Sequence, residues 1–343
     1  MRRPYRFPNG RNLPPLLLAF VKLHRGLPHF PSGTRRIVTT GTFDGVHLGH
    51  QALLGWMMDE AEAAGAETVV LTFDPHPRKV LFGDDSGLEL LQSLDQRAQS
   101  LEATGLDHLV VQPFDRAFSR LRPEDFVRDV LVRGLGCTTV VVGHDHRFGA
   151  GREGNEELLR ECGETYGFDV AHIPPHIEDE LTVSSTKIRQ RLHDGDVAGA
   201  RTLMGQSFQW QGQVVRGDGR GRQLGFPTAN LNALVSDQIL PAPGVYAVEA
   251  DWSDNPSGHP VPAMVHIGPR PTFDEADAAP RVEVHLLEAG RPDLYGRTLS
   301  LGFAERLRDI QKFDSSDGLI TQLHRDAQAA RDCLPQRNST DGR

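Results

Sequence analysis

Two histidines three residues apart, His47 and His50, follow a glycine-rich stretch of this 343-residue chain. The stretch lies between a β-rich run, 36–40, and a segment whose apolar spacing predicts a helix, 50–65. Side chains three apart lie on one side of a helix, so both imidazoles could face the same ligand. The unpaired N–H groups at a helix start also bind phosphate. This arrangement could stabilise the negative charge of a departing pyrophosphate group.

The glycines of this turn leave room for a nucleotide, because they let the backbone approach a ligand closely. We predict that a nucleotide or its phosphates bind to Gly41, Thr42, Phe43, Asp44, Gly45, His47, Gly49 and His50. The alternative is an ordinary pair of surface histidines near a helix start. The succession of strand, glycine-rich turn and helix favours the ligand site.

A second candidate site combines a glycine-rich loop with a rigid proline-containing turn over 217–230. Its candidate ligand residues are Gly217, Gly219, Arg220, Gly221, Gly225, Pro227, Thr228 and Asn230. Backbone N–H groups of such a loop can wrap phosphates, and the neutral oxygens of Thr228 and Asn230 suit Mg²⁺ or phosphate. The sequence contains no Gly-x-x-x-x-Gly-Lys-Ser/Thr string, so this is not a P-loop kinase site.

Phosphoryl transfer also requires a base that receives the proton of the attacking hydroxyl group. The strand-like run 281–287 contains one carboxylate, that of Glu283. Alternate residues of a strand point to opposite faces. Glu283 therefore lies opposite an apolar face formed by Val282, Val284 and Leu286. Outside this context, a lone glutamate at such a position would be an ordinary solvated strand residue.

Apolar strand-like runs alternate with amphipathic helical segments in the first half of the chain, which predicts a parallel sheet with helices on both faces. The predicted strands are 36–40, 68–73, 108–111, 138–143 and 169–173, and the predicted helices are 50–65, 92–104, 123–133, 155–166 and 184–192. Beyond 203–208, short strands punctuated by glycine and proline predict a small antiparallel barrel. Its strands are 211–215, 244–250, 261–267, 281–287 and 297–303, and a helix over 316–333 follows.

Several strings of the sequence resemble those of known families. The string 41–50 contains the His-x-Gly-His signature of the nucleotidylyltransferases. This string and the strings 72–77 and 184–189 are similar to those of the flavin branch of that family. The string Gly-Phe-Pro-Thr-Ala-Asn at 225–230 resembles the riboflavin kinase signature. Over roughly 21–332, the chain resembles the family of bacterial bifunctional riboflavin kinase/FMN adenylyltransferases, the FAD synthetases.

The resemblance implies a Rossmann-like nucleotidylyltransferase domain followed by a riboflavin kinase barrel. It implies phosphorylation of riboflavin to FMN and adenylyl transfer from ATP to FMN, which gives FAD and pyrophosphate. ATP is the implied co-substrate of both steps, and Mg²⁺ is the implied metal, with Thr228 and Asn230 as candidate ligands. The family glutamate that matches Glu283 is the expected general base.

The resemblance also implies two further groups of ligand residues in the adenylyltransferase domain. The second phosphate-binding motif would be Ser184, Ser185, Thr186 and Arg189, and the flavin-binding candidates are Asp74, Pro75, His76, Asp145 and Arg147. Four positions depart from the family pattern. His146 stands where members often have an aromatic residue, His266 where asparagine is usual, and Glu288-Ala289 where Asp-Phe is frequent. These departures leave the contact of His146 and the flavin affinity or rate of the kinase domain open.

The change of pattern near residue 204 predicts two domains. The limits are 1–20 for a leader, 21–204 for the FMN adenylyltransferase domain, 205–333 for the riboflavin kinase domain and 334–343 for a tail. The first 36 residues carry eight Arg or Lys side chains and no acid. Such a composition is typical of a transit peptide, but no clean apolar region accompanies it. We therefore expect a disordered leader or the product of an upstream start codon.

Composition narrows the class of protein. The formal net charge of −9 argues against a general nucleic-acid binder, which needs a basic face. No segment approaches the ~20 apolar residues of a membrane helix. The three widely spaced cysteines indicate neither a disulfide framework nor a zinc site. We expect a cytoplasmic protein whose partners are small-molecule substrates, without nucleic-acid or membrane partners, and a homo-oligomer is compatible with the sequence.

Two other functions and one further motif compete with this interpretation. The chain could bind flavin without turnover, which His266 alone supports, or adenylate another small phosphate ester, against which the string 225–230 argues. The Gly-x-Gly-x-x-Gly string at 149–154 matches a dinucleotide-binding fingerprint. Five polar or aromatic residues separate that string from the preceding strand, which disfavours a Rossmann dinucleotide site.

Overall fold

The computed structural model describes residues 21–83, 87–143, 146–173, 183–217, 221, 224–268, 280–287 and 293–335. Outside these ranges lie the leader 1–20 and five residues singled out above: Asp145, Gly219, Arg220, Glu288 and Ala289. Contacts within the chain separate two units. The first runs to Leu88 and continues over Ser93–Ser184, and the second comprises Glu89–Gln92 and the chain from Ser185 onward.

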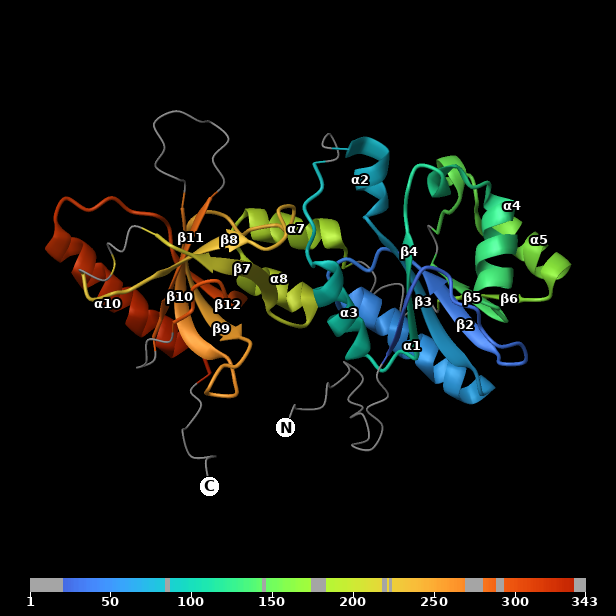
Figure 1. Cartoon of the computed structure of the whole chain (residues 1–343), viewed down its shortest axis with the longest axis horizontal. Coiled ribbons are helices and arrows are strands. Elements are labelled where there is room, and N and C mark those ends of the chain that lie inside the picture. The colour runs from blue at the N-terminus through green and yellow to red at the C-terminus, as the bar shows by residue number, and fades with distance from the viewer. Residues whose placement is uncertain are drawn as a thin grey trace, which may run out of the picture. The chain divides into compact units, whose positions relative to one another are not determined.

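A six-stranded sheet forms the centre of the first unit (Figure 1). All of its strand pairs are parallel, in the order β1-β4-β3-β2-β5-β6. The strands are β1 (Lys22–Arg25), β2 (Arg36–Thr40), β3 (Glu67–Asp74), β4 (His108–Pro113), β5 (Thr139–Val142) and β6 (Asp169–His172). The chain runs outward from β2 to β3 and β4 and then crosses to β5 on the other side of β2. The direction of winding therefore reverses between β2 and β5.

Helices connect the strands and cover both faces of the sheet, as the apolar runs predict. They are α1 (Leu48–Ala64), α2 (Pro77–Phe82), α3 (Leu94–Glu102), α4 (Pro123–Asp125), the π-helical segment η3 (Phe126–Gly134) and α5 (Glu156–Tyr166), with the short turns η2 (Phe118–Arg120) and η4 (Ala150–Arg152). The helix predicted over 123–133 is thus a single α-helical turn that continues as wider π-helical winding. The apolar spacing alone does not distinguish these two kinds of winding.

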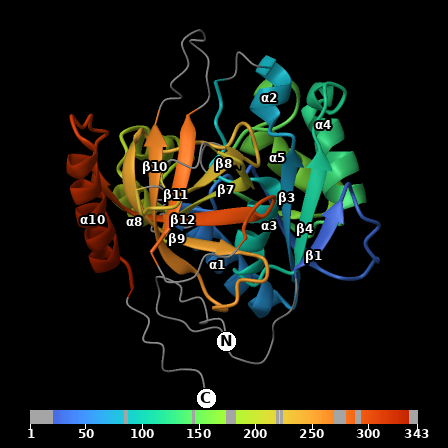
Figure 2. The same ribbon diagram turned by 60° about the vertical axis from the view of Figure 1, so that its left-hand side comes forward.

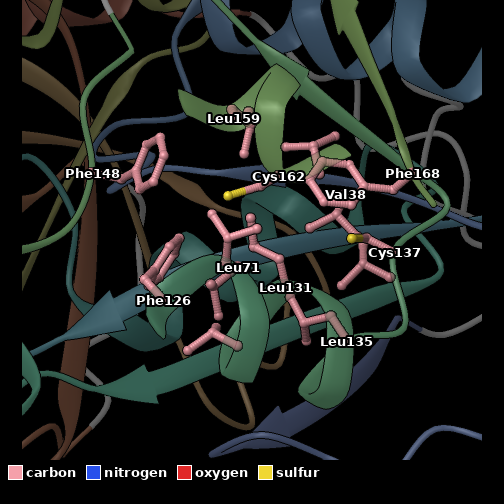
Figure 3. Close-up of a cluster of buried hydrophobic side chains, with 14 of the residues drawn as sticks. Val38, Leu71, Phe126, Leu131, Leu135, Cys137, Phe148, Leu159, Cys162 and Phe168 are labelled. Atoms are coloured by element: carbon pink, nitrogen blue, oxygen red, sulfur yellow. The ribbon is translucent and has the colours of Figure 1, made fainter. Parts of the chain in front are cut away.

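Strand alternation divides the hydrophobic core of the first unit between the two faces. Val69 and Leu71 of β3 pack against η3 and α5, whereas Val70 faces α1 and α3. Figure 3 shows the cluster around Leu71, which side chains of η3 and α5 cover. A strand covered on both faces needs apolar residues at successive positions. This explains the unbroken apolar run of β3 and confirms the predicted parallel α/β class.

The second unit contains a closed antiparallel barrel of six strands, in the order β10-β11-β8-β7-β12-β9. The strands are β7 (Phe208–Val215), β8 (Ala229–Ala233), β9 (Gly244–Trp252), β10 (Val261–Gly268), β11 (Arg281–Leu286) and β12 (Thr298–Arg308). Every second residue of β7 from Phe208 to Val214 is buried, as expected for a strand whose one side faces the barrel interior. The predicted small antiparallel barrel is confirmed.

Among the described residues, three helices belong to the second unit: α7 (Ser185–His193), α8 (Val197–Met204) and α10 (Ser316–Cys333). Helix α10 packs against β9, β10 and β12 (Figure 2), and α8 packs against β7 and β12. The segment 89–92 joins this unit through Leu90, whose N–H donates to the carbonyl oxygen of Asp237 at 2.7 Å. The domain limit predicted between 204 and 205 lies after α8. None of the described helices combines the length and apolar character that a membrane span requires.

Candidate active sites

The sheet of the first unit has one place where a ligand crevice is expected. In open parallel sheets, ligands bind beyond the carboxyl ends of the strands at the point where the winding direction reverses. This point lies between β2 and β5. Oγ1 of Thr40, the last residue of β2, lies 3.5 Å from Nε2 of His146, which follows β5. The turn 41–47 and the segment around His146 are therefore neighbours at this edge of the sheet.

The turn between β2 and α1 has a strained backbone that its own side chains hold in place. Phe43, Gly45 and Val46 have positive φ angles of 49°, 90° and 37°. For the two non-glycine residues such angles cost about 1–3 kcal/mol each. Phe43 and Val46 bury their side chains in the core below α1, which offsets this cost. Nε2 of Gln51 also donates to the carbonyl oxygen of Val46 at 2.7 Å, so the turn keeps one conformation.

His47 and His50 lie together at the start of α1. His47 is the N-cap residue, and its Nδ1 accepts a hydrogen bond from the N–H of His50 at 3.4 Å. The two rings stack with centroids 3.8 Å apart and an angle of 15° between their planes. Burial, and secondarily the neighbouring His47, lowers the pKa of His50 well below its usual value. His50 is therefore neutral at pH 7, and its buried Nδ1 has no hydrogen-bond partner among the described residues.

An arginine that the sequence patterns did not single out supports this turn. Arg97 of α3 donates from Nη1 to the carbonyl oxygen of Thr42 at 2.7 Å and from Nη2 to that of Phe73 at 3.2 Å. Burial lowers the pKa of Arg97, while the carboxylates of Asp44 and Asp74 raise it. Nothing in the local sequence distinguishes Arg97 from a surface arginine of an amphipathic helix. Its role depends on contacts with segments 24 and 55 residues away.

The predicted flavin-binding residues 74–76 lie where β3 ends and α2 begins. Asp74 and Pro75 are exposed and joined by a cis peptide bond. His76 is the N-cap residue of α2, and its Nδ1 accepts the N–H of Arg78 at 3.2 Å. These positions leave the two exposed residues accessible to a ligand, and their flavin contacts stay a prediction.

His146, where the family often has an aromatic residue, is partly buried beside the ring of Phe148, with centroids 5.8 Å apart. Burial, followed by the charge of Arg152, lowers the pKa of His146 to about 4. The uncharged imidazole thus packs as an aromatic ring does. Arg147, a predicted flavin-binding residue, is exposed to solvent.

The glycines at 149–154 have structural roles rather than a place at a dinucleotide. Phe148 and Gly154 form an antiparallel bridge, and only the short turn η4 lies between them. A Cβ atom on Gly154 would lie 2.6 Å from the ring of Phe148, and one on Gly149 would lie 2.7 Å from Pro123. The glycines are needed for this packing. The string does not join a strand to a helix, which agrees with the rejection of a Rossmann dinucleotide site.

The implied second phosphate-binding motif lies at the start of α7. Ser184 precedes the helix, and Ser185 and Thr186 are its first two residues. Arg189 donates from Nε to the carbonyl oxygen of Glu89 at 2.6 Å, so its guanidinium is held by the segment 89–92 of the same unit. N–H groups at a helix start can bind phosphate, and this motif stays a prediction.

The predicted base of the second site lies beside the predicted metal ligands. In the pairing of β8 and β11, Glu283 stands opposite Asn230. Oγ1 of Thr228 donates to Oε2 of Glu283 at 3.4 Å. All three residues line a cavity of about 430 Å³. Residues separated by 53 positions in the sequence thus form one polar cluster at the wall of a chamber.

Two further side chains, which the sequence patterns did not identify, organise this cluster. Nε of Arg281 lies 2.6 Å from Oε1 of Glu283 and 3.1 Å from Oδ1 of Asn230. A second contact involves Nδ1 of His285, which lies 2.8 Å from the carbonyl oxygen of Pro227 and so joins β11 to the turn before Thr228. Arg281 and His285 flank Glu283 at alternate positions of one strand, so the period-2 pattern could have indicated all three.

The glycines of this site are required by close packing. A Cβ atom on Gly217 would collide with the side-chain amide of Asn230, and one on Gly221 would collide with the carbonyl oxygen of Phe226. Gly225 has a φ angle of 82°, which favours glycine over other residues. Pro227 follows in the turn that leads to β8. Substitution of any of these glycines would displace the Thr228 turn.

The opposite wall of the cavity comes from β12, the segment after it and α10. A bidentate ion pair joins Arg308 to Asp326, with Nε 3.0 Å from both carboxylate oxygens and Nη2 2.7 Å from Oδ2. His266 of β10 also lines the cavity and stands opposite Glu283 in the pairing of β10 and β11. Burial lowers the pKa of His266, and the charge of Glu283 partly opposes this shift.

Comparisons with known proteins divide the chain at nearly the same place as its sequence pattern. The FAD synthetase profile matches residues 30–187, and the riboflavin kinase profile matches residues 204–334. The bifunctional riboflavin kinase/FMN adenylyltransferase of Escherichia coli strain K12 is 38% identical over 314 residues, which cover 91% of this chain and 97% of that protein. A protein of the same description from Listeria monocytogenes is 35% identical over 296 residues, which cover 86% of this chain and 91% of that protein.

A solved structure has a similar fold over nearly the whole chain. It is described as a macrolide-efflux protein from Streptococcus pneumoniae, is 31% identical and matches with a TM-score of 0.79, covering 91% of this chain and 99% of that one. The relatives from E. coli and L. monocytogenes have both activities in their description, and this chain matches them across both units. The chain therefore belongs to the family of bifunctional riboflavin kinase/FMN adenylyltransferases.

Proposed function

We propose that the barrel unit phosphorylates riboflavin and that the paired histidines of the first unit serve the adenylation of FMN. The chain is an enzyme of FAD synthesis with riboflavin kinase and FMN adenylyltransferase activities, and its substrates are riboflavin, FMN and ATP. The observation that most strongly supports the division of labour is the cluster of Glu283, Thr228 and Asn230 at the wall of the barrel cavity.

In the proposed kinase step, Glu283 receives the proton of the ribityl 5′-hydroxyl group of riboflavin. The hydroxyl oxygen forms a bond to the γ-phosphorus of ATP, and the bond from that phosphorus to ADP breaks. Arg281 pairs with Oε1 of Glu283, which leaves Oε2, the oxygen near Thr228, for the proton. Amides of the loop 217–225 would hold the phosphates.

The donor set of this cluster fits Mg²⁺. Magnesium prefers oxygen ligands and usually binds through one or two protein groups together with water and substrate phosphates. Oγ1 of Thr228 and Oδ1 of Asn230 are neutral oxygens of two residues that line one cavity. The Arg281 guanidinium, which donates to Oδ1 of Asn230, would turn away from that oxygen when the ion binds there. When bound, the ion would neutralise charge on the phosphates. The described residues contain no cluster of three or more His, Cys, Asp or Glu suited to a metal, so the substrate phosphates would complete the coordination.

In the proposed adenylyl transfer, a phosphate oxygen of FMN forms a bond to the α-phosphorus of ATP, and pyrophosphate leaves. No base is needed, because the phosphate is already ionised. The stacked rings of His47 and His50 would donate hydrogen bonds to the phosphates as charge develops, and His50 is neutral. Ser184, Ser185, Thr186 and Arg189 stay the predicted second phosphate motif, and Asp74, Pro75, His76, Asp145 and Arg147 stay the predicted flavin contacts.

We also propose a cytoplasmic location and the domain limits 21–204 and 205–333. The three cysteines are free, which supports a reducing compartment.

Limited proteolysis with mass spectrometry tests the domain limits: cuts near 204 support them, and cuts confined to the chain before 185 contradict them. Light scattering of the full chain tests whether it forms a homo-oligomer, which the sequence allows.

One chromatographic assay tests the proposed function. The purified chain is incubated with riboflavin, ATP and Mg²⁺, and the flavins are separated over time. We expect FMN to appear first and FAD to follow. Flavin binding without ATP consumption would instead indicate a flavin-binding module. FAD formation from added FMN, with riboflavin left unchanged, would indicate an adenylyltransferase with an accessory barrel.

A further inference from the structure

Arg97 is one of the most deeply buried charged side chains of the first unit. It lies on α3 with only 4% of its surface exposed. A buried guanidinium persists only when carboxylates or hydrogen-bond acceptors compensate the loss of water. Its guanidinium donates to two backbone carbonyl groups, one in the turn before α1 and one at the end of β3. Arg97 thus joins two segments that flank the adenylyltransferase site.

The first of these hydrogen bonds fixes the orientation of a peptide group in the phosphate turn. The bond from Nη1 to the carbonyl oxygen of Thr42 is short, at 2.7 Å. A trans peptide is planar, so the N–H of Phe43 points in the direction opposite to that carbonyl. Phe43 also has a left-handed φ angle, which makes this peptide costly to hold in place. Arg97 therefore fixes the direction in which the Phe43 amide is presented.

The charge of Arg97 is compensated within the protein. Asp44 is 1% exposed, and it acts on Arg97 together with the carboxylate of Asp74. A cation balanced by two nearby carboxylates contributes little net attraction to a polyphosphate. Its contribution is therefore geometric. Nε of Arg97 is buried and has no hydrogen-bond partner among the described residues. The contacts that stabilise the fold therefore do not satisfy this N–H group.

We propose that Arg97 is a positioning residue of the adenylyltransferase site, which holds the Thr42 carbonyl so that the Phe43 amide faces the phosphates of ATP. This inference rests on the proposed function of the turn 41–50. Arg97 touches no reacting atom and acts through the backbone that it holds. Its second hydrogen bond, to Phe73, keeps the turn in register with the end of β3.

The test uses the full chain, because its kinase reaction provides an internal control for folding. Arg97→Met keeps most of the side-chain volume and removes both hydrogen bonds. We expect kcat for FAD formation from FMN to fall about a hundredfold, the size of effect that a misplaced reacting group produces. The rate of FMN formation from riboflavin should stay within about twofold, since the Arg97 contacts lie in the other unit.

Two further variants separate positioning from stability. Arg97→Lys keeps a charge, but an ammonium group cannot reach both carbonyls as the planar guanidinium does. We therefore expect kcat for FAD formation to be about tenfold below wild type, higher than in Arg97→Met. Thr72→Val is the matched control, because Oγ1 of Thr72 is the other donor to the Thr42 carbonyl, at 3.2 Å. Loss of this neutral bond should lower kcat for FAD formation less than about threefold. Thermal unfolding is recorded for each variant.

Several outcomes would overturn the inference. One is FAD formation by Arg97→Met within twofold of wild type, and another is an equal loss from Thr72→Val. If Arg97→Met does not fold, Arg97→Lys decides: full FAD formation by this variant, or an equal loss of both activities, contradicts the proposal. Wild-type chain that makes FMN but no FAD would refute the proposed function of the turn itself, which is a different result from any variant effect.

Discussion

At the scale of single residues, the paired imidazoles of His47 and His50 show how burial prepares a site for phosphate chemistry. The rings stack at 3.8 Å. Two imidazolium ions so close together would repel each other, and burial disfavours the charge further. A neutral His50 avoids this repulsion and still has one N–H group to donate. In the proposed site, His50 would therefore stabilise phosphate through a placed hydrogen bond rather than through positive charge.

His146 leads to a prediction on pH. Its pKa in the folded chain is about 4, against about 6.5 when unfolded. Protonation therefore favours the unfolded chain, and the stabilising contribution is full above pH 6.5 and is lost as the pH falls through 4. The total effect is about 3 kcal/mol. An NMR titration of the imidazole Cε1–H signal should give a midpoint near 4.

The variant His146→Phe lacks this signal and therefore assigns it to His146. The same variant allows a second test, the dependence of stability on pH. This variant should lose less stability than wild type between pH 7 and pH 4.5, because it has no imidazole to protonate. Urea unfolding at the two pH values checks this difference. A titration midpoint close to 6.5, or equal acid sensitivity of the two proteins, contradicts the assignment.

The residue scale also shows what local sequence can and cannot reveal. The pairing of His47 and His50 was predictable, because spacing within one segment places their side chains together. The role of Glu283 was predicted from the resemblance of its string to that of riboflavin kinases. Arg97 was not, because its acceptors come from two other segments and its own helix pattern is ordinary. The same holds for Arg308 and Asp326, which meet only after α10 packs on the barrel.

At the scale of elements, the contact between β12 and α10 combines apolar packing with a buried ion pair. Arg308 and Asp326 have side chains that are 15% and 4% exposed. Removal of one partner leaves a buried charge without compensation, which costs roughly 3–5 kcal/mol. Asp326→Asn should therefore lower the free energy of unfolding of the barrel unit by about 3 kcal/mol. Urea unfolding followed by the fluorescence of Trp210 and Trp252 measures the change.

An exposed pair from the same region is the control. Arg306 and Asp309 lie 2.9 Å apart, with Asp309 82% exposed. Exposed pairs contribute about 0–1 kcal/mol, so Asp309→Asn should have almost no effect. Equal losses from the two substitutions would show that burial does not determine the strength of the α10 contact.

The elements that the sequence predicted and those that it did not differ in their exposure. Strands β3 and β5 are buried on both faces and have apolar runs, so they were predictable. Strand β1 lies at the edge of the sheet, and its four residues are largely exposed, so no apolar pattern marks it. Helices α2 and α8 have six and eight residues, too few for their periodicity to be recognised.

At the scale of the whole molecule, the chain contains two sites with different chemistry in two separate units. FMN is the product of one site and the substrate of the other. The order of the motifs predicted this organisation, because the string 41–50 lies in the first unit and the string 225–230 lies in the second. The motif 184–189 is the exception, since the boundary falls between Ser184 and Ser185. The segment 89–92 was not assigned to the barrel unit, because its pairing with Asp237 and Gln238 spans almost 150 residues.

The most direct test of two independent sites is a mixing experiment with two full-length variants, Glu283→Gln and His50→Gln. Each is incubated with riboflavin, ATP and Mg²⁺, alone and together, and the flavins are separated by chromatography. We predict that Glu283→Gln alone leaves riboflavin unchanged, that His50→Gln alone accumulates FMN, and that the mixture forms FAD. FAD formation at the wild-type rate by either variant alone, or a mixture that forms none, would contradict the account.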